Sequence, residues 1–236
     1  MLEPARTYPY LLWSLMLMVV CLLGLSVCPR QQRWPVILSG LLMVPFSVPL
    51  MLIEPEYWHP TRVAVFLTGP EDILFTFACG GIVWLMSIWL VRDRLAVNLN
   101  AARMARRYLL GTLGGLAIGG ACRLAGAGPM TSLVMSFVSF ALCVFWLGGR
   151  LWPLAVTGLG GFTILYFAVL KAVLTLSSGF INQWNTATLW GPRVLGVPLD
   201  EVAGAAAFGL AWPLFAAYLF DARLEALEIE GPNREG

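Results

Sequence analysis

Charged residues are scarce in this sequence. Asp, Glu, Lys and Arg make up 12% of the 236 residues, while hydrophobic residues make up 59%. Because soluble domains carry about 25% charged residues, so little charge excludes an ordinary soluble fold. The formal net charge of +2 also excludes the basic surface that a nucleic-acid partner requires. We therefore expect the lipid bilayer to be the solvent for most of this chain.

Patterns that bind metals or form disulfide frameworks are missing as well. The one histidine, His59, lies in a loop where we expect a residue of the membrane interface. The cysteines lie in apolar stretches and lack the short paired spacing of zinc sites, so we expect small buried hydrophobes, no metal and no cofactor. They are Cys21, Cys28, Cys79, Cys122 and Cys143.

Long apolar segments are abundant instead. A helix of about 20 apolar residues crosses the hydrocarbon core of a membrane. Segments of this kind cover residues 8–28, 34–53, 71–91, 108–126, 131–148, 151–170 and 199–220. The sequence therefore predicts an all-α integral membrane protein with about seven transmembrane helices.

Arginine is distributed unevenly between the loops. If the helices alternate in direction, most arginines fall on one face, which the positive-inside rule assigns to the cytoplasm. This predicts a multi-pass protein of the cell (inner or plasma) membrane with its N-terminus outside and its C-terminus in the cytoplasm. The arginine-rich face holds Arg30, Arg33, Arg92, Arg94, Arg103, Arg106, Arg107, Arg150, Arg223 and Arg234, and the other holds Arg6, Arg62, Arg123 and Arg193.

An internal repeat organises the chain. The acidic pair Glu71-Asp72 opens the third predicted helix, and the pair Asp200-Glu201 opens the seventh, 129 positions later. Two parallel three-helix repeats that face each other would share a pocket at their interface. The predicted units are a first repeat in residues 1–107, a connector helix in residues 108–130, and a second repeat with a short C-terminal tail in residues 131–236.

The acidic pairs have a structural and a functional explanation. Pro70 and Pro198 are typical of helix starts, where the positive end of the helix dipole stabilises acidic residues. A carboxylate inside the bilayer costs about 2.5 to 3.5 kcal/mol on insertion scales, so intramembrane acids mark candidate functional sites. Because two adjacent carboxylates occur at corresponding positions of both repeats, we favour the functional explanation.

The two motif regions resemble the tandem membrane lycopene cyclases of archaea, some bacteria and carotenogenic fungi, and the resemblance extends over nearly the whole chain. That family carries a Pro-x-acid-acid motif in each repeat. The second repeat keeps this spacing in Pro198-Leu199-Asp200-Glu201, whereas Pro70 directly precedes the first acidic pair. Ala203 and Ala205 also replace the aromatic residues expected after the second pair. The resembling stretches are residues 56–60, 69–82, 182–185 and 195–201.

The resemblance implies a proton-initiated cyclisation of lycopene ends to β-ionone-type rings, without net redox change. A carboxylic acid protonates the terminal double bond, the neighbouring double bond attacks the tertiary cation, and a base removes a ring proton. A dry pocket keeps water away from the cation. The implied partner is a hydrophobic polyene or isoprenoid in the bilayer, and the oligomeric state stays open.

The resemblance also implies roles for individual residues. The candidate catalytic acids and bases are Glu71, Asp72, Asp200 and Glu201. The candidate substrate-binding residues are Trp58, Phe75, Asn182, Trp184 and Asn185. Aromatic faces can stabilise a cation, although tryptophans also anchor membrane proteins at the interface.

Other functions remain open. One is a noncatalytic isoprenoid-binding or prenyltransferase-like protein, although magnesium-diphosphate enzymes need more acidic residues than two short pairs. A noncatalytic scaffold is another. A retinal photoreceptor would use the lone lysine, Lys171, for a Schiff base, but microbial rhodopsins carry that lysine in their last helix. The glycine-rich run 111–120 predicts close packing of the connector against another helix.

Overall fold

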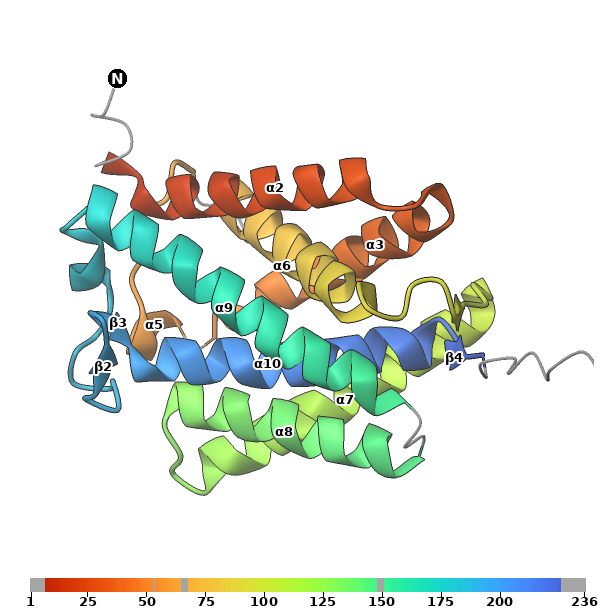
Figure 1. Ribbon diagram of the computed structural model, residues 1–236. Coiled ribbons are helices and arrows are strands. Elements are labelled where there is room, and N and C mark those ends of the chain that lie inside the picture. The colour runs from red at the N-terminus through yellow and green to blue at the C-terminus, as the bar shows by residue number, and fades with distance from the viewer. Residues whose placement is uncertain (1–6, 53, 65–67, 148–150, 226–236) are drawn as a thin grey trace, which may run out of the picture.

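The computed structural model of the chain describes residues 7–52, 54–64, 68–147 and 151–225. Most of these residues are helical, and the long helices form a bundle, as Figure 1 shows. Arg6, Arg150 and Arg234, which contributed to the topology prediction, lie outside the described residues. The chain therefore has the mostly helical architecture that its apolar segments predicted.

The elements of the described residues are α2 (Pro9–Val27), α3 (Arg30–Met43), η1 (Val44–Phe46), α4 (Ser47–Leu50), α5 (Glu54–Tyr57), α6 (Pro70–Ile88), β1 (Leu95–Ala96), α7 (Ala101–Leu124), α8 (Pro129–Leu147), α9 (Trp152–Leu176), η3 (Phe180–Gln183), β2 (Arg193–Val194), β3 (Val197–Pro198), α10 (Leu199–Leu219) and β4 (Arg223–Leu224). The short strands pair antiparallel, β1 with β4 and β2 with β3.

Six helical segments among the described residues are long and apolar enough to cross a membrane. They are Pro9–Val27, Arg30–Leu50, Pro70–Ile88, Pro129–Trp146, Trp152–Leu176 and Leu199–Leu219. The remaining predicted span, residues 108–126, belongs mostly to α7, which is long but is not one of the six. Its glycines and arginines make α7 less apolar, so the predicted count of seven is not confirmed.

The second predicted span is interrupted in the structure. We expected one helix over residues 34–53, but α3 begins at Arg30, and the 3-10 turn η1 separates α3 from α4. Pro45 and Pro49 lack the N–H group that a continuous α-helix needs at these positions, which accounts for the irregular turn.

The two helices that carry the acidic pairs, α6 and α10, are also the most enclosed spans. α6 packs against α2, α3 and α9, and α10 packs against α8 and α9. Glycines permit two close crossings. A Cβ at Gly80 would lie 2.7 Å from the carbonyl oxygen of Ser39, and a Cβ at Gly209 would lie 2.7 Å from that of Gly158. Each acidic helix is therefore held closely by its neighbours.

Candidate functional site

Both acidic pairs lie in the first turn of a buried helix. α6 begins at Pro70, and Asp72 accepts a hydrogen bond of 2.7 Å from the N–H of Gly69, which caps the helix. α10 begins at Leu199, directly after β3, as Figure 1 shows. All four acidic side chains are buried, so each carboxyl group depends on partners within the protein.

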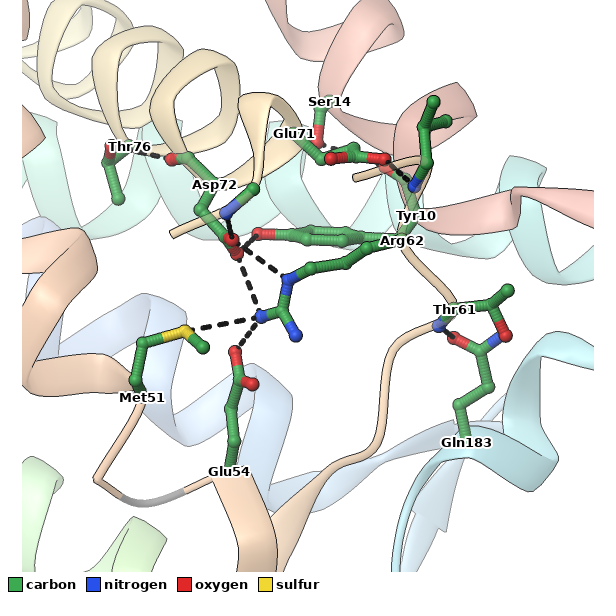
Figure 2. A network of polar contacts seen from close by, with 12 residues as sticks. Tyr10, Ser14, Met51, Glu54, Thr61, Arg62, Glu71, Asp72, Thr76 and Gln183 are labelled. Atoms are coloured by element: carbon green, nitrogen blue, oxygen red, sulfur yellow. Dashed lines mark hydrogen bonds and ion pairs between the residues drawn. The ribbon is translucent and has the colours of Figure 1, made fainter. Parts of the chain in front are cut away.

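Asp72 is the centre of a charged network, which Figure 2 shows. The Tyr10 hydroxyl donates to Oδ1 of Asp72 at 2.8 Å. Arg62 donates from Nε to Oδ2 at 2.9 Å and from Nη2 to Oδ1 at 3.1 Å. The same guanidinium also pairs with Glu54, and it lies over the Tyr10 ring. This two-pronged arginine contact fixes the position of the Asp72 carboxylate.

Arg62 brings a permanent cation to this network. Burial alone would lower its pKa, but the hydrogen bonds with Asp72 and Glu54 outweigh burial and raise the pKa of Arg62 above its ordinary value. Only 7% of the side chain is exposed, so water screens this charge weakly. Asp72 is thus paired with a buried, fully charged partner.

Glu201 is surrounded by neutral donors instead. The Tyr57 hydroxyl and the Trp184 indole N–H donate to Oε1 at 2.9 and 2.8 Å, and the Tyr166 hydroxyl donates to Oε2 at 2.7 Å. Burial is the main cause that raises the pKa of Tyr57, which keeps its hydroxyl protonated. None of the ion pairs among the described residues includes Glu201.

Glu71 and Asp200, the other two acids, contact loop backbone. Oε1 of Glu71 accepts a hydrogen bond of 2.6 Å from the N–H of Val63. Oδ2 of Asp200 accepts a hydrogen bond of 3.2 Å from the N–H of Trp190. Each acid therefore ties the loop that precedes its helix to the helix start.

One member of each acidic pair lines a shared cavity of about 140 Å³. Asp72 and Glu201 belong to its lining, whereas Glu71 and Asp200 do not. The aromatic part of the lining includes Tyr10, Trp13, Trp58, Phe75, Phe162 and Tyr166. Glu54 is a third acid of the lining and pairs with Arg62. A largely apolar volume with aromatic walls and carboxyl groups suits chemistry that passes through a carbocation.

Of the three aromatic residues predicted to bind substrate, two line the cavity and the third contacts it from behind. Trp58 and Phe75 line the cavity. Trp184 lies behind Trp58, with ring centroids 5.6 Å apart in a stacked arrangement, and its indole N–H is bonded to Glu201. The backbones of Trp58 and Trp184 also form an isolated antiparallel bridge. Trp184 thus positions Trp58 and Glu201 from outside the lining.

The two predicted asparagines are not part of the cavity lining. Asn182 lies in η3 and is exposed. The Asn185 side chain donates to the carbonyl of Glu56 at 2.9 Å and accepts from the N–H of Ala187 at 3.2 Å. Asn185 therefore connects its loop to α5, and its backbone N–H donates to the carbonyl of Tyr57 at 2.9 Å.

Two other residues considered from the sequence lie at the surface. His59 is exposed, and its backbone N–H donates to the carbonyl of Gln183 at 2.7 Å. Lys171 is exposed as well, and its ammonium group donates to the carbonyl of Leu195 at 2.7 Å. A retinal Schiff base would require an enclosed lysine, so the position of Lys171 disfavours the photoreceptor alternative.

Four residues that contact the cavity carboxyl groups were not predicted: Tyr10, Tyr57, Arg62 and Tyr166. Tyr57 adjoins Trp58 in the first motif region, which was the one available signal for it. Arg62 stood out only as an arginine on the arginine-poor face. Tyr10 and Tyr166 are tyrosines in apolar helices, and such residues commonly anchor a helix at the membrane interface.

No protein family, curated protein or solved structure matches this chain. Among the described residues, no group of three or more His, Cys, Asp or Glu side chains could hold a metal ion. The geometry of the residues themselves is therefore the basis for a functional proposal.

Proposed function

We propose that the chain is a membrane-embedded isoprenoid cyclase that closes the ends of a linear carotenoid such as lycopene into β-ionone-type rings. One observation carries this proposal: Asp72 and Glu201, from two different helices, line one apolar cavity with aromatic walls. The resemblance of the motif regions to the tandem lycopene cyclases supports the substrate class. The reaction is an isomerisation and needs neither an oxidant nor a reductant.

Glu201 is the proton donor in this proposal. It is buried without a cation, and burial in such surroundings penalises a charged carboxylate. A proton on Oε2 can be donated to the Tyr166 hydroxyl, which also acts as an acceptor, while Tyr57 and Trp184 keep donating to Oε1. The O–H bond breaks as a C–H bond forms at the terminal double bond of the polyene.

Asp72 is the base. The ion pair with Arg62 holds the Asp72 carboxylate in place, where it can take a proton from the new ring. The neighbouring double bond has by then closed a C–C bond onto the tertiary cation, and loss of the ring proton leaves a double bond. Asp72 then releases its proton to solvent and Glu201 gains one, so atoms and charge balance over the cycle. The faces of Trp58 and Phe75 stabilise the cation.

We also propose that the chain consists of two parallel repeats related by a pseudo-twofold axis. Equivalent helices pack alike, α6 on α2 and α3, and α10 on α8 and α9. Leu95 and Leu224 lie 129 positions apart, the spacing of the acidic pairs, and they pair directly between β1 and β4. Trp58 and Trp184 likewise pair with each other. An axis between the repeats brings equivalent residues face to face in this way.

The orientation in the membrane is part of the proposal. Figure 1 places β4 at one end of the bundle, and α5, β2 and β3 at the other. Most arginines occur in the segments near β4, which supports a cytoplasmic location for that end. Reporter fusions after Arg107 and at the C-terminus should report cytoplasm, and a fusion within residues 54–68 should report the outside. The reverse pattern would overturn this orientation.

Expression of the chain in a lycopene-accumulating bacterium tests the proposed reaction. We expect cyclic carotenoids from the unmodified chain and none from Glu201→Gln, with both proteins present in the membrane at equal levels. If the unmodified chain binds lycopene and leaves it linear, cyclisation is wrong and the noncatalytic isoprenoid-binding function replaces it. If the chain neither binds nor changes lycopene, the noncatalytic scaffold is the remaining alternative function.

A further inference from the structure

A second apolar cavity adjoins the cavity of the acids. Its volume is about 300 Å³, and it lies between the η1–α4 segment and helices α7, α8 and α10. Four residues line both cavities, so the two spaces are direct neighbours that share part of their walls. These shared residues are Met43, Leu50, Leu133 and Phe137. We refer to the second cavity as the α7 groove.

The α7 groove reaches the surface of the bundle. Leu52 and Leu116 belong to its lining and are 79% and 48% exposed. On the α7 side, glycines replace bulky side chains: a Cβ at Gly119 would meet only Ser136, at 3.8 Å, which is ordinary contact. The glycine-rich run was expected to pack closely against another helix. The structure shows such packing at Gly111, where a Cβ would lie 2.5 Å from the ring of Phe215, and leaves open space beside Gly119.

Most polar side chains of the groove are already engaged, although the buried hydroxyl of Thr112 has no hydrogen-bond partner among the described residues. Arg123 lines the groove, but its guanidinium donates to Glu56 at 2.5 Å and to the carbonyl of Ala127 at 2.7 Å. Ser136 donates to the carbonyl of Gly115 at 2.7 Å. The surfaces left for a ligand are therefore mainly hydrocarbon and aromatic, which favours an apolar chain over a charged headgroup.

We propose that the α7 groove binds the linear isoprenoid chain of the substrate while one chain end occupies the cavity of Asp72 and Glu201. This assignment rests on the proposed function for the position of the reacting end. A long polyene cannot fit into the acid cavity alone, and the α7 groove is the adjacent apolar space, separated from it only by the shared side chains, between which the chain would pass. The path would also let a lipid-dissolved substrate enter sideways from the membrane.

The test measures binding separately from cyclisation. The purified full chain in lipid nanodiscs is incubated with lycopene, and the pigment retained per protein is measured by visible absorbance. Gly119→Leu places a side chain in the groove and should lower retention about tenfold or more. Gly114→Leu is the matched control, because Gly114 lies on the same helix, has open space around its Cβ position and is not part of the groove lining. It should retain pigment like the unmodified chain.

The outcomes test the groove assignment and the proposed cyclisation separately. Equal retention by Gly119→Leu and Gly114→Leu overturns the groove assignment. Lipid acyl chains would then be the ligand that fills the groove. Retention by the unmodified chain without ring formation rejects the proposed cyclisation and preserves the groove. If Gly119→Leu does not fold, as judged by size-exclusion profile, Leu116→Trp narrows the groove from its exposed rim and serves the same comparison.

Discussion

The surroundings of Asp72 and Glu201 differ although the two residues occupy corresponding positions of α6 and α10. Asp72 shares two hydrogen bonds with the guanidinium of Arg62, whereas the Glu201 partners are two tyrosine hydroxyls and an indole. A buried carboxylate beside a cation is stabilised in its charged form, and one among neutral donors lacks that compensation. Corresponding positions of the two helices thus have different electrostatic surroundings.

In the proposed cyclisation, this contrast separates the proton donor from the proton acceptor. Acid–base catalysis requires one group that holds a proton and another that accepts one at the same pH. Glu71 and Asp200 contribute to neither task in our proposal, because each bonds loop backbone next to its helix start. The following tests would break or sharpen the contrast between the two carboxyl groups.

The largest effect is expected at the proposed acid. Glu201→Gln keeps the size of the side chain and removes its acidic proton, so cyclisation should slow by about 100-fold to 10,000-fold. Glu71→Gln is the matched control, since the amide oxygen can still accept the hydrogen bond from Val63. Pigment analysis of membranes with equal protein content measures both. A fully active Glu201→Gln would leave the acids a purely structural role.

The next largest effect should come from the cation. Arg62→Met leaves Asp72 and Glu54 buried without their partner, and breaking a buried ion pair in this way costs about 3 to 5 kcal/mol. Denaturant or thermal unfolding in detergent measures this loss. The double variant Arg62→Met/Asp72→Asn should recover part of it, because one uncompensated charge is gone. No recovery would mean that Arg62 acts on stability without Asp72.

A smaller loss is expected at the neutral site. Tyr166→Phe removes one donor from Glu201 and leaves two, which should cost about 1 to 3 kcal/mol. Tyr57→Phe removes a donor from the other carboxyl oxygen and should have a similar effect. The same unfolding assay applies. If either tyrosine variant were destabilised as much as Arg62→Met, the contrast between a charged and a neutral site would not hold.

The smallest effects on stability are expected at the two predicted asparagines, and they should differ between the two positions. Asn185→Ala removes the bonds to Glu56 and Ala187 and should cost about 1 kcal/mol. Asn182→Ala changes an exposed residue and should stay within about 0.5 kcal/mol. Stability and pigment yield can be compared side by side. A loss of cyclisation in Asn182→Ala, with stability unchanged, would restore Asn182 to the site.

The sequence predicted the helices better than their interruptions. The first, third and last predicted spans end within a few residues of α2, α6 and α10, because length and apolarity alone define a transmembrane helix. The break at η1 was missed, since prolines within apolar segments are tolerated in many membrane helices. The two-residue strand pairs have no periodic pattern that a sequence could reveal.

The site was predictable in its acids and only partly in their partners. The repeated acidic pairs stand out because carboxylates are rare in apolar segments. Which member of each pair faces the cavity depends on the rotation of α6 and α10 against their neighbours, which the motif does not encode. Tyr10 lies 62 positions from Asp72, and Tyr57 lies 144 positions from Glu201. Contacts at such separations follow from the packing of the whole bundle.

The antiparallel pairings between the two halves of the chain have a mechanical consequence. Trp58 pairs with Trp184 near α5, and Leu95 pairs with Leu224 at the opposite end of the bundle in Figure 1. Transporters built from repeats move substrates by rocking one half against the other. Here the backbone bonds at both ends would have to break before such a motion. The two halves are therefore fastened to each other at both ends of the bundle, and in the proposed cyclisation they would hold the cavity still around the substrate.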